Sequence, residues 1–99
     1  MKYYKILKGN WGHYKIGTIY PEDYTDSYGY NPSYHYTFHK DKMKEVSYAD
    51  YLKQEYDAGR ISFDIIYEEY SRGKIGFNGY VAIYSNIYYN NNKTNNMVS

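Results

Sequence analysis

Tyrosine content limits the folds open to this sequence: 18 of its 99 residues are Tyr, three are Phe and none is Cys. Without disulfides, a chain of this length must be stabilised by packing around one small core. A Tyr ring buries a large apolar area while its hydroxyl stays hydrated. The excess of Tyr over Phe therefore predicts half-exposed aromatic surface, as in binding sites. The alternative is that these rings fill the core.

Charge is nearly balanced, with 12 Lys and Arg against 11 Asp and Glu. No strong field attracts the chain to nucleic acid or to a membrane surface. The only arginines are Arg60 and Arg72, which argues against a dedicated reader of duplex DNA. The apolar stretch at the amino terminus is too short for a signal peptide or a membrane span. We expect a cytoplasmic protein without a membrane partner.

Alternating apolar residues predict two opening strands, residues 2–8 and 14–20, with Tyr4 and Ile6 on the same face of the first strand. Residues 9–12 provide a turn between them, and Gly17 marks a bend. A strand, a glycine turn and a second strand that reads Tyr-Lys-Ile-Gly-Thr-Ile-Tyr resemble the opening of small SH3-like barrels. The resemblance implies a strongly bent antiparallel sheet.

One helix is predicted over residues 48–58, because Ser47 can cap its start and Gly59 can end it. Its inward stripe has helical spacing and contains Tyr48, Tyr51, Leu52 and Tyr56. Alternating patterns predict further strands over residues 34–38, 61–67 and 74–84. The expected inward residues of the last two strands are Ile61, Phe63, Ile65, Phe77, Val81 and Ile83.

The expected fold is therefore α+β, a small bent antiparallel sheet, SH3-like in form, with one α-helix. We expect residues 1–89 to form a single globular domain and the polar residues 90–99 to form a disordered tail.

Residues 20–36 are dense in Tyr and are interrupted by Pro, Gly and acidic residues, which predicts a long loop. Long loops in compact domains are often functional. The segment contains no Lys or Arg, so a partner with a basic surface is expected. The candidate partner-binding residues are Tyr24, Asp26, Tyr28, Tyr30, Tyr34, His35 and Tyr36.

An alternative ligand is a nucleotide, a cyclic nucleotide or a single-stranded nucleic acid that stacks on these rings. Its phosphates would then face Lys40, Lys42 and Lys44, which follow the Tyr-rich segment.

No catalytic, metal or cofactor site is expected. His35 and His39 are four residues apart but lack a third ligand at a suitable spacing. The sequence contains neither a nucleophile elbow around a serine nor a phosphate-binding loop. These patterns favour a non-enzymatic interaction protein.

The small size and the Tyr-, Asn-, Lys- and Ile-rich composition resemble those of accessory proteins of phages or mobile elements from low-GC hosts. This resemblance implies a stoichiometric inhibitor that occludes a host defence or nucleic-acid-handling protein in the host cytoplasm. The identity of the partner and the oligomeric state stay open.

Overall fold

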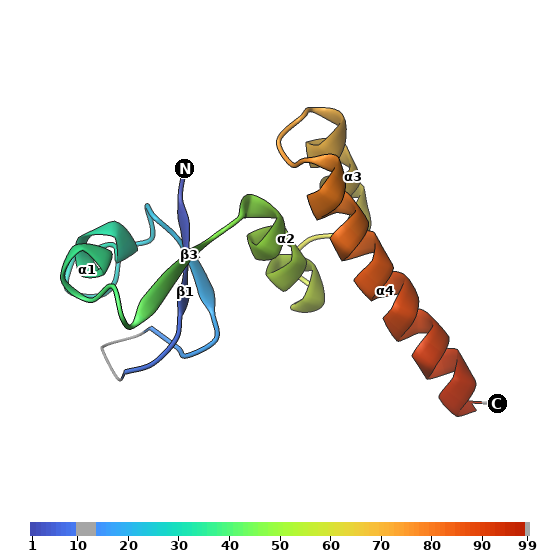
Figure 1. Cartoon of the computed structure of the whole chain (residues 1–99), viewed down its shortest axis with the longest axis horizontal. Coiled ribbons are helices and arrows are strands. Elements are labelled where there is room, and N and C mark those ends of the chain that lie inside the picture. The colour runs from blue at the N-terminus through green and yellow to red at the C-terminus, as the bar shows by residue number, and fades with distance from the viewer. Residues whose placement is uncertain (10–13, 99) are drawn as a thin grey trace. The chain divides into compact units, whose positions relative to one another are not determined.

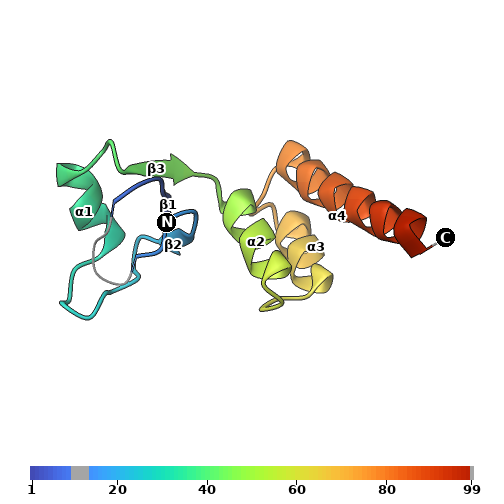
Figure 2. The same cartoon turned by 90° about the horizontal axis from the view of Figure 1, so that it is seen from below.

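The computed structural model describes the backbone of residues 1–9 and 14–98 and the side chains of residues 1–9 and 14–88. The chain divides into two compact units, Met1–Gln54 (unit 1) and Glu55–Ser99 (unit 2). Its elements, in chain order, are β1 (Tyr3–Ile6), β2 (Ile19–Pro21), α1 (Pro32–Phe38), β3 (Met43–Val46), α2 (Tyr48–Asp57), α3 (Phe63–Ser71) and α4 (Phe77–Val98) (Figures 1 and 2). The boundary between the units falls within α2.

The strands of unit 1 form an antiparallel sheet in the order β2-β1-β3. Tyr4 in the central strand lies opposite Tyr20 on one side and Glu45 on the other. The α+β class is thus confirmed. The SH3-like barrel is wrong, because the described sheet has three short strands and stays open, whereas a barrel requires closure of the sheet.

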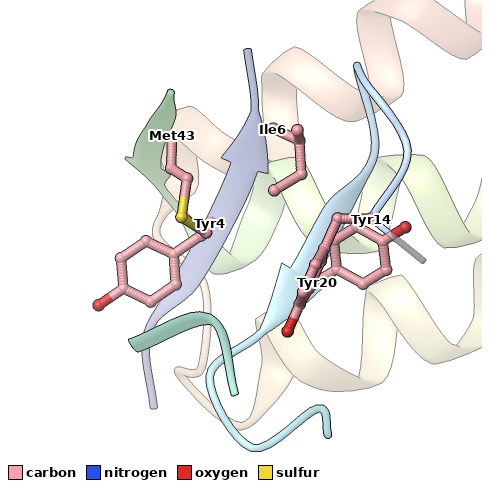
Figure 3. Close-up of a cluster of buried hydrophobic side chains, with 5 residues drawn as sticks. All are labelled: Tyr4, Ile6, Tyr14, Tyr20 and Met43. Atoms are coloured by element: carbon pink, nitrogen blue, oxygen red, sulfur yellow. The ribbon is translucent and has the colours of Figure 1, made fainter. Parts of the chain in front are cut away.

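A buried cluster of unit 1 lies on one face of this sheet and contains more Tyr than any other residue. Its buried members are Tyr4, Ile6, Tyr14, Tyr20 and Met43 (Figure 3). The predicted shared face of Tyr4 and Ile6 is confirmed, since both are buried and Lys5 between them is exposed. Of the turn predicted at residues 9–12, the part from residue 10 onward lies outside the described residues.

The helix predicted from residue 48 is confirmed as α2. Ser47 Oγ accepts a hydrogen bond from the Asp50 amide at 3.1 Å, and Asp50 Oδ2 accepts one from the Ser47 amide at 3.3 Å. This reciprocal pair closes the first turn. Gly59, with a φ of +76°, follows the last turn, as expected for a residue that ends a helix.

The strand predicted over residues 34–38 is wrong, because these residues belong to α1. Asn31 Oδ1 accepts a hydrogen bond from the Tyr34 amide at 2.9 Å, and Pro32 occupies the first turn. Both features start a helix. Aromatic residues at 30, 34, 36 and 38 fit a spacing of two and a spacing of four alike, so periodicity could not distinguish a strand from a helix here.

The strands predicted over residues 61–67 and 74–84 are also wrong. These residues lie mainly in α3 and α4, so the structure has four helices in its described part instead of the expected one. Helical geometry buries Ile66, whereas the predicted inward residue Ile65 is exposed. Ile83 is buried as expected, but Phe77 and Val81 are exposed.

Unit 2 is held together by contacts between α3 and α4, where the rings of Tyr70 and Tyr80 stack at 4.4 Å. The two helices lie side by side, and α4 continues past the end of α3 (Figures 1 and 2). The predicted single domain over residues 1–89 and the predicted tail over residues 90–99 stay predictions.

Candidate functional site

The loop before α1 is built around the buried carboxylate of Asp26. Asp26 Oδ1 accepts hydrogen bonds from the amides of Tyr28 at 2.9 Å and Tyr30 at 3.0 Å. The Asp26 amide donates to the Tyr30 carbonyl at 2.9 Å, and the Gly29 amide donates to the Asp26 carbonyl at 3.0 Å. Gly29 has a φ of +89°, which a residue with a side chain rarely adopts. The loop that carries Tyr28 and Tyr30 is therefore closed on itself.

The same carboxylate joins this loop to α1. Asp26 Oδ2 lies 3.1 Å from His35 Nε2, and both side chains are largely shielded from water. Burial by itself would raise the pKa of Asp26. The hydrogen bonds from the Tyr30 amide, the His35 ring and the Tyr28 amide lower it by more than burial raises it, so the pKa lies below its ordinary value. Asp26 is thus an ionised acceptor for two backbone amides and one imidazole.

Tyr14 supports this arrangement from the core. Its ring meets the His35 ring edge-on at 5.4 Å, and its hydroxyl donates to the Tyr30 carbonyl at 3.3 Å. Burial, followed by the nearby negative charge of Asp26, raises the pKa of the Tyr14 phenol. The phenol therefore stays protonated at neutral pH and remains a hydrogen-bond donor.

Above these buried groups lies a row of exposed rings, which we call the aromatic ridge: Tyr30, Tyr34 and Phe38. Tyr30 and Tyr34 stack at 4.8 Å, and Tyr34 lies 5.2 Å from Phe38. The spacing of four residues aligns the three rings along one side of α1 and the turn before it. They are 47%, 48% and 65% exposed, and Tyr28 at the tip of the loop is 75% exposed.

The structure divides the predicted partner-binding residues into two groups. Tyr28, Tyr30 and Tyr34 are exposed, whereas Tyr24 and Tyr36 pack against the core and Asp26 and His35 lie beneath the ridge. Phe38 and Tyr14 were missed. Phe38 could have been found from its spacing to Tyr30 and Tyr34, had the segment been interpreted as a helix. Nothing in the local pattern identifies Tyr14.

The predicted phosphate-binding lysines are dispersed. Lys40 is exposed just after α1, and Lys42 is partly buried. Lys44 lies directly across from Lys5 in the sheet, and both are exposed. Lys5 and Lys44 lie on the face of the sheet opposite to Tyr4. Tyr36 of α1 packs on the Tyr4 face, with 4.9 Å between the centres of the two rings.

His35 and His39 lie in and just after α1. Within the described residues, no three His, Cys, Asp or Glu side chains are grouped so that they could hold a metal ion. Among the helices of this part of the chain, none combines the length and the apolar character needed to cross a membrane.

Comparisons of the chain with protein-family models, with curated proteins and with solved structures found no match.

Proposed function

We propose that this is a non-enzymatic interaction protein that binds another protein through the aromatic ridge and the neighbouring Tyr28. The observation that carries the proposal is the stack of three half-exposed rings on a loop and helix held together by Asp26. Aromatic side chains dominate binding hot spots. A surface ordered before binding loses less conformational entropy when the partner docks, so rigidity favours affinity.

Charge around the ridge favours a partner with Lys or Arg on its surface. The segment from Tyr20 to Phe38 contains no Lys or Arg. Glu22 reaches α1, where its Oε2 accepts a hydrogen bond from Ser33 Oγ at 3.4 Å, and Asp23 is exposed. The faces of Tyr and Phe rings also attract guanidinium and ammonium groups. We propose that the protein acts stoichiometrically, by occluding a basic surface such as a nucleic-acid groove in a host enzyme.

The test compares a ridge variant, Tyr30→Ala with Tyr34→Ala, with the wild type and with Tyr67→Ala. Tyr67 is a matched control because it is a Tyr of α3 that is 57% exposed. Proteins captured from a low-GC bacterial lysate are identified by mass spectrometry, and their affinity is then measured by titration. Loss of a hot-spot ring costs about 2 kcal/mol or more, so the ridge variant should bind at least about 30-fold more weakly. Circular dichroism confirms the fold.

Undiminished capture by the ridge variant would contradict the proposal, as would equal loss by the Tyr67→Ala control. Single-stranded nucleic acid is the other outcome, and the exposed pair Lys5 and Lys44 is the observation that favours it. In that case an oligonucleotide would bind with an affinity that falls steeply with salt. Binding would also weaken in the Lys40→Ala and Lys44→Ala variants but not in the Tyr67→Ala control.

A further inference from the structure

A second apolar surface lies in unit 2, on α4. Four of its residues, Phe77, Val81, Tyr84 and Tyr88, are between 38% and 65% exposed. Their successive spacings are four, three and four residues, which is the spacing of the a and d positions of a heptad repeat. They therefore form one stripe along the helix, which we call the α4 seam.

The contact with α3 is centred on residues of α4 outside the seam. Ile83 is buried, and Tyr80 stacks on Tyr70 and lies 6.0 Å from Phe63. Two of the seam residues also approach α3, Tyr84 at 6.1 Å from Phe63 and Phe77 at 6.5 Å from Tyr70. They nevertheless remain 52% and 65% exposed. Because α3 has nine residues and α4 has 22, α3 accompanies only part of α4 (Figures 1 and 2).

Uncharged sequence surrounds the seam. No Asp, Glu, Lys or Arg occurs from Ile75 to Asn92. A helix with one face in water normally carries charged residues on that face. A helix that extends beyond its packing partner is also only marginally stable in water. Both observations indicate that the seam is a surface for another protein helix.

We propose that the seam pairs with the seam of a second copy of this chain, so that α4 forms a symmetric dimer. A single stripe is self-complementary across a two-fold axis. In coiled coils, charged residues beside the seam select one partner over another. The sequence of α4 has no such residue before Lys93, which follows the seam, so two copies meet along the seam without repulsion and no charge beside it selects a foreign helix. This inference concerns unit 2 and does not depend on the ridge.

Analytical ultracentrifugation of the full chain over a range of concentrations tests the proposal. The wild type should pass from monomer to dimer as its concentration rises. For the double variant Tyr84→Glu, Tyr88→Glu, the dissociation constant of the dimer should be at least about tenfold higher, because dimerisation would bury like charges. Ala82→Glu is the matched control, since Ala82 is exposed on the same helix and lies neither in the seam nor at a position that flanks it in a heptad. It should dimerise like the wild type.

Cysteine cross-linking locates the contact even if the Glu variants misfold. The natural chain has no Cys, so each introduced thiol reports one position. With a mild oxidant, Tyr88→Cys should link to itself in a parallel dimer. In an antiparallel dimer, Tyr88→Cys should link to Phe77→Cys of the other copy. Ala82→Cys should stay largely unlinked.

Three results would overturn the proposal. The first is a wild type that stays monomeric at every concentration. Such a result would also be expected if another part of the same chain covers the seam. The second is a dimer that both the Glu variants and the cysteine cross-links place outside the seam. The third is a dimer abolished by the ridge variant, which would assign self-association to unit 1.

Discussion

The carboxylate of Asp26 fixes the position of the loop and the helix that carry the aromatic ridge. It accepts hydrogen bonds from two backbone amides of the loop and from the ring of His35 in α1. A buried charge is costly unless it is paired and hydrogen-bonded. Here every buried polar side-chain atom in the described residues has a partner. Asp26 is buried, so its role in the proposed site is to position Tyr30 of the ridge and the neighbouring Tyr28.

Acid should weaken this arrangement. The pKa of Asp26 in the folded protein lies below its ordinary value, so the unfolded chain binds more protons between the two values, and stability falls with falling pH there. Its contribution is complete above the ordinary pKa of about 4 and is lost as pH falls through the folded pKa. The difference in free energy of unfolding between wild type and Asp26→Asn should therefore shrink from about pH 6 to about pH 3. Urea unfolding at each pH measures it.

A difference that stays constant with pH would contradict this prediction. Asp26→Ala serves as the comparison, because Asn keeps an acceptor for the two amides and Ala does not. Leaving buried amides unpaired costs about 1–3 kcal/mol, so Asp26→Ala should be less stable than Asp26→Asn at neutral pH.

At the scale of elements, α2 is tied to the edge of the sheet by one side chain. Gln54 Oε1 accepts from the Ile19 amide at 2.6 Å, and Gln54 Nε2 donates to the Ile19 carbonyl at 3.0 Å. β2 is an edge strand of three residues, and the backbone groups of edge strands otherwise lack a neighbour in the sheet. Gln54 thus replaces a fourth strand at this position.

Gln54→Ala should open this edge. Two lost hydrogen bonds at about 1 kcal/mol each correspond to about 30-fold faster exchange of the Ile19 amide, measured by hydrogen exchange and NMR. Gln54→Met keeps the length and packing of the side chain but makes neither bond. If Gln54→Met protects Ile19 as well as Gln54 does, packing and not hydrogen bonding holds the edge, and the prediction fails.

The whole molecule carries its two proposed surfaces on separate units. The ridge lies within Met1–Gln54 and the α4 seam within Glu55–Ser99. They share no element, and each surface has rings stacked within its own unit: Tyr30 stacks on Tyr34, and Tyr84 stacks on Tyr80, which lies outside the seam. We therefore expect the proposed partner binding and the proposed self-association to be independent of each other.

The two activities should separate by mutation. Tyr30→Ala with Tyr34→Ala should lose the partner and keep the dimer, whereas Tyr84→Glu with Tyr88→Glu should lose the dimer and keep the affinity of each chain for the partner. Substitutions at sites that share no contacting residues usually act independently. Sedimentation and titration of both variants provide the check. Loss of both properties in either variant would show that the surfaces are coupled.

Sequence and structure agree where local interactions decide. The faces of β1 follow from the alternation of Tyr4 and Ile6 with Lys5, and α2 follows from its capping pair and Gly59. The helices α1, α3 and α4 were not predicted, because aromatic residues at several spacings fit both periods and Tyr is a frequent strand residue. Of the tyrosines proposed for the candidate site, Tyr28, Tyr30 and Tyr34 are exposed, whereas Tyr24 and Tyr36 pack against the core, and Phe38 was missed.

The sequence alone determined that the chain is α+β, rich in Tyr and dependent on packing without disulfides. Only the tertiary structure decided which tyrosines are buried. Tyr14 and Tyr20 entered the core, while Tyr30 and Tyr34 remained outside. A Tyr ring is stable in either place, because its apolar face gains from burial and its hydroxyl gains from water. The choice therefore depends on which helix or sheet face each ring meets, and residues distant in sequence determine that.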